Sequence, residues 1–370
     1  MHLTINLIGK QFGDGFMATI KDVAERAGVS KTLVSRYLNN QKGVSPVSRE
    51  KITEAIKALN YRPNGLARSL VLQETQTIGI VLDNLGSPFV SRLISGFEKG
   101  AEDYDRENKY SILFCSANGD IKKKQSHIKF LTQGRVDGII IYGSLISDDT
   151  IIEELSHSTF PFLLIENDAA GIDANKIVID NTGGAYLATE YLIKAGFKKI
   201  AHIAGNMNLK ITLDRMNGFV RALQDYKIPI DRNMIVYPEF PVKSPEHIHS
   251  GSDRTYFDVG YAEMKKMIDQ KNIPEAIFFA TDISAFGAIK ALNEAGLSVP
   301  GDVSIIGFDD ERPCDYECDF KPISTLRQPL EEAGYIGIKT LIKNVKDINR
   351  PKERIILKPE FIIRDSCKKI

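Results

Sequence analysis

A short segment near the N-terminus carries side chains that could contact DNA together. Val34 and Leu38 are apolar and four residues apart, so a helix through them would turn both to one side. The polar side chains that this helix would place on its other side are Lys31, Thr32, Ser35, Arg36 and Asn39. Cationic and hydroxyl groups on a short helix suit the major groove of DNA. The spacing therefore predicts a DNA-reading helix, and the alternative is a small helical hairpin whose charges are only solvated.

A second group of side chains could bind a small molecule. Phe89 follows the β-rich run Ile78–Leu82, Arg215 lies at the start of a helical pattern, and Asp282 directly follows the run Ala276–Ala280. A carboxylate and a guanidinium can each form two-pronged hydrogen bonds to vicinal hydroxyls, while an aromatic ring covers an apolar face. We predict an effector site made by these three residues, with a sugar as the ligand. Taken singly, the phenylalanine could be a core residue, the arginine a surface ion pair and the aspartate a helix cap.

Two short helices joined by a tight turn would position the DNA-contacting side chains. Thr19 can cap the first helix, and Asp22 three residues later completes a capping box. Gly28 stands where the helix needs a left-handed residue to end, and Ser30 can cap the second helix. A third helix begins at Pro46. The pattern predicts a helix-turn-helix domain over residues 17–62.

The segment Thr19–Asn39, TIKDVAERAGVSKTLVSRYLN, resembles the DNA-binding head of the lactose-repressor (LacI/GalR) family of bacterial transcription regulators. It departs from the family pattern at Leu33, where the family has a threonine. The resemblance implies a homodimer on a pseudo-palindromic, double-stranded operator. It also implies base contacts by Lys31, Thr32 and Arg36, and contacts to the DNA backbone by Thr19, Ser30, Ser35, Asn39 and Tyr61.

Residues 63–74 connect this domain to the rest of the chain. The stretch Tyr61–Leu70 has little apolar surface to bury, so a helix here would be marginal in isolation. The resemblance implies a hinge that becomes helical on the operator, with Leu70 wedged between base pairs in the minor groove. A plain linker is the alternative. Residues 1–16 show no periodic pattern and would be a disordered extension, or the product of an upstream start codon taken in error.

From Thr77 onward, short β-rich runs alternate with amphipathic helices, and the alternation restarts after Ile177–Ile179. Such alternation predicts parallel sheets with helices on both faces. The expected fold is a small all-α helix-turn-helix head joined by a hinge to an α/β core of two doubly wound parallel-sheet subdomains, which the resemblance makes periplasmic-binding-protein-like. The core would span residues 75–365, with 75–178 and 309–340 in one subdomain, 179–308 and 341–365 in the other, and 366–370 as a tail. Effectors would bind in the cleft between them.

Charge is unevenly distributed along a chain whose formal net charge is zero. Residues 17–72 contain ten Lys or Arg against four Asp or Glu, a net of +6, and residues 1–16 are neutral. The remainder is therefore acidic. A basic N-terminal domain followed by an acidic remainder is typical of a protein that binds a polyanion through one domain only.

Chemistry of other kinds finds little support in the sequence. Cys314 and Cys318 have no further zinc ligands nearby in the sequence, so we interpret them as reduced thiols. His247 and His249 could bind a metal, but a solvated loop is the favoured interpretation because no third ligand is nearby. No phosphate-binding loop and no nucleophile motif occurs, so we expect neither an enzyme nor a cofactor or metal. No signal peptide or membrane span is recognised, which favours a cytoplasmic protein.

The combined expectation is a dimeric, effector-responsive repressor of a sugar-utilisation operon. A sugar-binding receptor of a transport system shares the expected core, but it would need a signal peptide and no DNA-binding head. An enzyme with a DNA-binding appendage is the other alternative.

Overall fold

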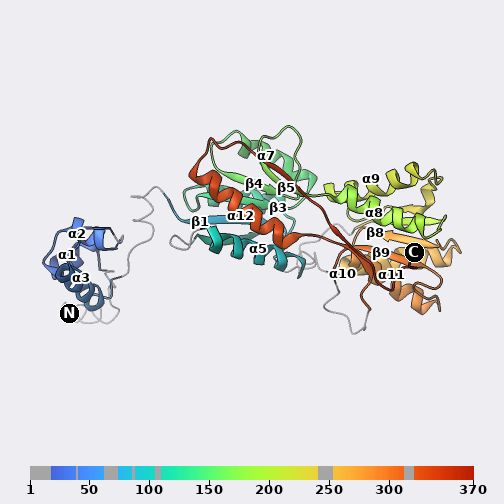
Figure 1. Ribbon diagram of the computed structural model, residues 1–370, viewed down its shortest axis with the longest axis horizontal. Helices are drawn as coiled ribbons and strands as arrows, with labels where there is room; N and C mark the ends of the chain where they lie inside the picture. The colour runs from blue at the N-terminus through green and yellow to red at the C-terminus, as the bar shows by residue number, and fades with distance from the viewer. Residues whose placement is uncertain are drawn as a thin grey trace, which may run out of the picture. The chain divides into compact units, whose positions relative to one another are not determined.

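The computed structural model describes residues 18–38, 41–61, 74–85, 88–104, 110–240, 253–311 and 321–370. The chain forms two compact units, residues 1–75 and residues 76–370 (Figure 1). Within the described ranges, no helix is both long enough and apolar enough to cross a membrane.

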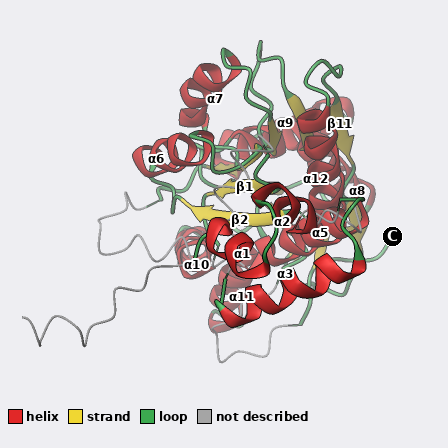
Figure 2. Cartoon of the chain, turned by 90° about the vertical axis from the view of Figure 1, so that its left-hand side faces the viewer, coloured by secondary structure: helices red, strands yellow, loops and turns green. Residues whose placement is uncertain are grey.

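In its described residues, the first unit contains three helices that pack on one another (Figure 2). They are α1 (Ile20–Ala27), α2 (Lys31–Leu38) and α3 (Pro46–Ala58). Small and β-branched side chains fill the space between them, and the buried ones are Val23, Ala24, Ala27, Val34, Val44, Ile52 and Ala55. Small residues on α1 allow the other two helices to approach it closely. This arrangement confirms the predicted helix-turn-helix.

The first lobe of the second unit is a six-stranded parallel sheet in the order β11-β5-β4-β3-β1-β2. The strands are β1 (Thr77–Leu82), β2 (Ser111–Ser116), β3 (Gly138–Tyr142), β4 (Phe162–Ile165), β5 (Asn175–Ile179) and β11 (Arg354–Leu357). Helices α5 (Pro88–Tyr104) and α12 (Leu330–Lys346) cover one face, where Ile80 is buried. Helices α6 (Ile121–Thr132) and α7 (Asp149–Ser156), with the short turn η1 (Ile146–Asp148), lie on the other side, where Val81 is buried.

The second lobe repeats this architecture with the order β12-β10-β9-β8-β6-β7, in which β12 runs antiparallel to its neighbour. The strands are β6 (Ile200–Ile203), β7 (Ile235–Val236), β8 (Ala276–Phe279), β9 (Ser304–Asp309), β10 (Ser324–Arg327) and β12 (Glu360–Ile362). Its helices are α8 (Asn181–Lys194), α9 (Lys210–Asp225), α10 (Asp253–Asp269) and α11 (Asp282–Glu294). Helices α8 and α9 pack on one face and α10 and α11 on the other, which confirms the predicted doubly wound sheets.

The chain passes between the two lobes three times, after β5, after β10 and after β11. In Figure 1 the dark red segment that follows β11 runs from the first lobe to the second. This pairing differs from the expected division of the core. Residues 324–327 pair with β9 in the second lobe rather than joining the first, and residues 354–357 pair with β5 in the first lobe. The sequence does not identify these runs as strands, and the sheet edge that each one joins depends on long-range pairing.

A close helix crossing attaches the late helix α12 to the first lobe. A Cβ on Gly96 of α5 would lie 2.1 Å from the carbonyl oxygen of Glu331, and one on Gly334 of α12 would lie 2.3 Å from that of Leu93. Both distances are far below van der Waals contact, so each position requires glycine. The crossing therefore holds a segment from the C-terminal part of the chain against the helix that follows the first strand.

Candidate DNA-binding face and effector cleft

The outer face of α2 carries the side chains predicted to contact DNA. Lys31, Thr32 and Arg36 are exposed, Ser35 is half-buried, and the helix contains no acidic residue. Leu33, which departs from the family pattern, packs against the core of the three-helix unit and is therefore not part of the outer face. The exposed surface of α2 is thus polar and cationic, as expected for a helix that enters the major groove.

Local hydrogen bonds fix the start of α1 and the turn before α2. The Thr19 N–H donates to Asp22 Oδ2 at 2.7 Å and the Thr19 hydroxyl accepts from the Asp22 N–H at 3.4 Å, which confirms the capping box. Gly28 has a φ of +64°, and Ser30 Oγ accepts from the Leu33 N–H at 3.2 Å. The capping box fixes where α1 begins, and Gly28 and Ser30 fix where α1 ends and α2 begins.

Three further predicted DNA contacts, Tyr61, Asn39 and Leu70, are not on the outer face of α2. Tyr61 packs against the core of the three-helix unit, and burial raises the pKa of its hydroxyl above the usual value. Asn39 and Leu70 lie outside the described residues.

Arg215 is the centre of a polar cluster where strands of the second lobe end. The side chain is 2% exposed, and its Nε donates to Asn181 Oδ1 at 2.8 Å. Its Nη1 donates to the carbonyl oxygen of Ala280 at 2.5 Å and lies 3.3 Å from Asp309 Oδ1. The guanidinium carbon stacks 3.7 Å from the centre of the Phe308 ring. Its Nη2 is buried and has no protein hydrogen-bond partner, so the guanidinium has a free donor for a ligand.

Asp282, the carboxylate predicted to accompany Arg215, makes internal hydrogen bonds. Its two oxygens accept from the Thr325 hydroxyl at 2.7 and 3.0 Å, and Oδ2 also accepts from the Glu311 N–H at 2.8 Å. Burial raises the pKa of Asp282 well above its usual value, and the nearby charge of Asp309 raises it further. These bonds tie the start of α11 to β10 within the second lobe.

The carboxylate beside Arg215 belongs to Asp309, which is not among the residues predicted from the sequence. Its Oδ1 also accepts from Gln328 Nε2 at 2.6 Å. Burial raises the pKa of Asp309, while the Arg215 charge opposes that rise. Asp309 is the last residue of a buried parallel strand, the same type of position that led to the selection of Asp282, so the signal was present in the sequence.

The first lobe contributes three further polar side chains from the carboxyl ends of its strands. Glu166 follows β4 with a φ of +62°, and its carboxylate accepts from the Ile179 N–H at 2.7 Å and from Asn181 Nδ2 at 3.2 Å. Burial raises the pKa of Glu166 to about 7, against the lowering effect of these bonds and of Arg215. Tyr142 ends β3, and Asp83 follows β1.

Tyr142 shows that the two lobes face each other through these groups. Burial raises the pKa of its hydroxyl, and the charges that act on it come from Glu166 and Asp83 of the first lobe and from Arg215 and Asp309 of the second. The facing strand ends of the two lobes therefore carry the Arg215 guanidinium and the carboxyl groups of Asp83, Glu166 and Asp309. Phe89 lies in the first turn of α5, and its side chain is outside the described part of the chain.

On one side of this cleft the lobes are joined by backbone pairing. Leu145 and Leu209 form an antiparallel bridge, and the Lys210 N–H donates to the carbonyl oxygen of Ser144 at 2.8 Å. The Lys210 ammonium group donates to an Asp149 carboxylate oxygen at 2.5 Å. These contacts hold the second lobe against the segment that follows β3.

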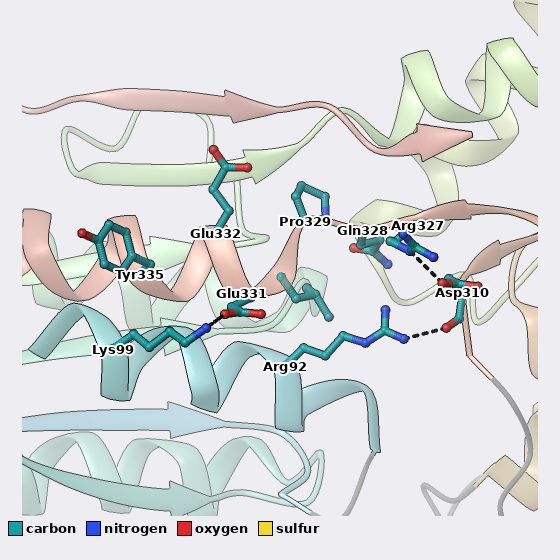
Figure 3. Close-up of a pocket in the computed structure, with 10 residues that line it drawn as sticks. Arg92, Lys99, Asp310, Arg327, Gln328, Pro329, Glu331, Glu332 and Tyr335 are labelled. Carbon is teal, nitrogen blue, oxygen red and sulfur yellow. Dashed lines mark hydrogen bonds and ion pairs between the residues drawn. The ribbon is translucent and has the colours of Figure 1, made fainter. Parts of the chain in front are cut away.

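On another side the lobes meet at the crossing between β10 and α12 (Figure 3). Arg92 of α5 donates to the carbonyl oxygen of Asp310 at 2.9 Å, and the Asp310 carboxylate accepts from Arg327 at 2.7 Å and from Arg364 at 2.6 Å. A cavity of about 660 Å³ lies here, lined by α5, the end of β10 and the start of α12. Asp310 directly follows Asp309, so the groups of the cleft and of this junction are adjacent in the chain.

No group of three or more His, Cys, Asp or Glu side chains suited to a metal ion occurs among the residues that the structure describes. The sequence candidates His247, His249, Cys314 and Cys318 all lie outside those residues.

Two protein families match separate parts of the chain. Residues 19–64 match the family described as bacterial regulatory proteins, lacI family, and residues 189–367 match the periplasmic binding protein-like domain. The chain is 34% identical over 359 residues to the HTH-type transcriptional repressor PurR of Haemophilus influenzae (strain PittEE), covering 96% of this chain and 100% of the relative. It is 31% identical over 351 residues to the ribose operon repressor of Haemophilus influenzae (strain KW20/Rd), covering 95% and 98%.

Solved structures agree with these relationships. The Lac repressor dimer bound to operator and the anti-inducer ONPF matches with a TM-score of 0.79 and 25% identity, covering 94% of this chain and 98% of that one. A LacI family regulator from Enterococcus faecium with bound ribose matches with a TM-score of 0.62 and 27% identity, covering 79% and 98%. Since the relatives are transcriptional repressors rather than enzymes or transport receptors, the chain belongs to the lacI family of bacterial regulatory proteins and is a DNA-binding transcriptional repressor.

Proposed function

We propose that this repressor binds a pseudo-palindromic operator as a homodimer and that an uncharged sugar, held between the lobes, controls its operator affinity. The observation that carries the proposal is the cluster at the facing strand ends, where Asn181 donates to Glu166 of the first lobe and accepts from Arg215 of the second, which pairs with Asp309.

On the DNA side, Lys31, Thr32 and Arg36 contact base edges. The groups that position the DNA backbone are Thr19, Ser30, Ser35, Asn39 and Tyr61. Leu70 of each hinge wedges between base pairs in the minor groove. The exposed, acid-free outer face of α2 and the net charge of +6 over residues 17–72 support this assignment, because phosphate neutralisation supplies most of the affinity and base contacts supply the specificity.

The charges of the cleft support a ligand that is rich in hydroxyl groups. The unpartnered Nη2 of Arg215 offers N–H donors, while the Asp309 carboxylate offers acceptors and the Glu166 carboxyl, whose pKa is about 7, can both accept and donate. A sugar hydroxyl both donates and accepts, so it can satisfy both kinds of partner. A phosphate only accepts, and its charge would lie close to carboxylates. The bound ribose in the Enterococcus faecium regulator supports the same ligand class.

Control of DNA binding would follow from the angle between the lobes. A ligand that contacts both lobes favours one angle, and it can shift the equilibrium only by its differential affinity for the two angles. Couplings of this kind are typically about 1–3 kcal/mol, or roughly 5–150-fold in operator affinity, and they act reciprocally between the two ligands. Phe89, Arg215 and Asp282 remain proposed ligand contacts, and Asp309 is added to them. The Asp282 carboxylate also accepts a hydrogen bond from Thr325.

The test is calorimetric titration of the full chain, with and without an operator duplex. The probes are ribose, glucose, their phosphates, and hypoxanthine as a planar heterocycle. We expect a neutral sugar to bind and to change operator affinity by the same factor by which operator changes sugar affinity. Asp309→Asn should abolish the response while leaving ligand-free operator affinity within a few-fold, and Asp225→Asn, an exposed position on α9, should change neither. Preference for a phosphorylated sugar or for hypoxanthine would contradict the proposed ligand class.

A further inference from the structure

Two backbone segments from opposite lobes, residues 144–146 and residues 208–210, form an antiparallel bridge that we call the seam. The Ile146 N–H donates across the seam at 3.0 Å, and the Lys210 N–H donates back at 2.8 Å. No side chain of the described residues caps the start of α9, so the first lobe supplies a partner for an N–H of its first turn. Hydrogen bonds need close and directed approach, so the seam can form only over a narrow range of angles between the lobes.

The side chain of Lys210 adds polar contacts to the seam. Its ammonium group donates to Asp149 Oδ1 at 2.5 Å and to Asn167 Oδ1 at 2.9 Å. Asp149 begins α7 and Asn167 lies shortly after β4, so both partners belong to the first lobe. Asn167 is fully buried, whereas the side chains of Lys210 and Asp149 are 21% and 49% exposed. Lys210 therefore connects the second lobe to two separate elements of the first.

These contacts also carry a cost. Asn167 Nδ2 is buried and has no hydrogen-bond partner among the residues that the structure describes. A buried donor without a partner is unfavourable, while an ion pair that is partly exposed to water contributes little. The two effects have opposite signs, so the seam does not fix the lobes permanently. The differential affinity of a ligand can then shift the angle between them.

The seam lies next to the groups of the cleft along the chain. Asn167 directly follows Glu166, and Lys210 precedes Arg215 on the same helix, α9. Asn181 connects the two cleft residues, because it accepts from Arg215 Nε at 2.8 Å and donates to the Glu166 carboxylate at 3.2 Å. Contact between Lys210 and Asn167 therefore brings together the faces of the two lobes that an effector in the cleft would meet.

We propose that Lys210 is the positioning residue of an inter-lobe clasp, made with Asp149 and Asn167, that favours the lobe angle preferred by the effector. The clasp contacts neither effector nor DNA. It strengthens effector binding by stabilising the arrangement in which the seam is formed, and it biases operator affinity in the same direction as the effector does. The inference rests on the proposed function, because it requires that the lobe angle controls operator affinity.

Thermodynamic linkage determines the sign of the expected effects. If the clasp and the effector favour the same lobe angle, loss of the clasp weakens effector binding. Loss of the clasp also moves the operator affinity of the ligand-free protein in the direction opposite to that in which the effector moves it. This relation holds whether the effector releases or promotes operator binding. A contact with a purely structural role would change thermal stability and leave both affinities unchanged.

The experiment compares the full-length wild type with Lys210→Met, Asp149→Asn, the double variant and the matched control Lys194→Met. Lys194 is a half-exposed lysine whose partner, Glu190, lies on the same helix. Ribose and glucose affinities are measured by calorimetry, and operator affinity without sugar by fluorescence anisotropy. We expect each single variant to weaken sugar binding by about twofold to fivefold, and the double variant to lose no more than the larger single loss. Lys194→Met should behave as wild type.

The outcomes separate the clasp from the proposed function. Unchanged affinities in both single variants, additive losses in the double variant, or an operator shift in the same direction as that of the effector each overturn the clasp and leave the proposed function standing. If the wild type binds neither sugar, the proposed ligand class fails, and the operator measurements still decide on the clasp through the non-additive shift of the ligand-free protein. Should Lys210→Met not fold in thermal melts, Asp149→Asn decides alone, since it retains the shape of a half-exposed side chain.

Discussion

Replacing Glu166 with Gln should change how the stability of the repressor depends on pH. Burial raises the pKa of Glu166 from 4.5 to about 7. Between these values the folded chain keeps a proton on Glu166 that the unfolded chain has lost, so rising pH favours unfolding. His202 acts in the opposite direction. It is buried between Phe219 and Phe278, and burial lowers its pKa from 6.5 to about 4.

The two contributions nearly cancel in the wild type. Between pH 4 and 6.5 the unfolded chain holds a proton on His202 that the folded chain lacks, so the free energy of unfolding rises with pH in this range. Above pH 6.5 His202 is neutral in both states, and this destabilising effect is absent. Binding one proton more or less on unfolding changes the free energy of unfolding by about 1.36 kcal/mol for each pH unit. Each group therefore contributes a change of about 2 kcal/mol between about pH 5 and about pH 7. The signs are opposite, so the net change from this pair is close to zero.

Urea unfolding of the full chain at about pH 5 and about pH 7, followed by circular dichroism, tests this balance. Relative to wild type, Glu166→Gln should become more stable by about 2 kcal/mol on going from the lower to the higher pH. The matched variant His202→Asn keeps a donor for the carbonyl oxygen of Phe278, which Nδ1 contacts at 2.9 Å, and should become less stable by a similar amount. All other titrating groups are common to the three proteins. Differences from wild type that stay constant with pH would refute the reasoning for both residues.

Other predictions concern the head, the hinge, the helix crossing and the N-terminal extension. Arg36→Ala should weaken specific operator binding by about 1–3 kcal/mol and random DNA far less in fluorescence anisotropy, and equal losses would identify a phosphate contact. Leu70→Ala should weaken operator binding and reduce DNA bending in a phasing assay, so unchanged bending contradicts a wedge. Gly334→Ala should cost about 1–3 kcal/mol of stability in thermal melts, because its Cβ would meet the carbonyl oxygen of Leu93 at 2.3 Å. A chain that starts at Met17 should melt and bind operator as the full chain does, and a clearly lower melting temperature would argue that residues 1–16 pack on the fold.

Local patterns were sufficient for the head. The cap at Thr19, the left-handed Gly28 and the cap at Ser30 depend on residues a few positions apart, and the structure shows each of them. The alternating strands and helices of the core up to β9 were likewise predicted from their periodicity, because burial on both faces of a parallel sheet leaves continuous apolar runs in the sequence. The later elements β10, α12, β11 and β12 were not predicted.

Contacts between distant residues were not predictable in the same way. Asp282 is a candidate from the sequence because it directly follows a strand, and the structure adds Asp309, which ends the neighbouring strand and pairs with Arg215. Both residues have a similar local pattern. The difference arises from Thr325, which lies 43 residues from Asp282 in the chain and occupies its carboxylate.

The sequence by itself therefore determined the class of the protein: a helix-turn-helix head, an α/β core of two lobes and a cationic helix for DNA. These features depend on short-range periodicity, capping and charge. Only the tertiary structure decided which lobe receives β10 and β11, that Asp309 accompanies Arg215, and that Lys210 of one lobe pairs with Asp149 of the other. Strand pairing and the partners of buried charges depend on which distant segments of the chain come into contact. The residues next to each strand or charge in the sequence do not determine those contacts.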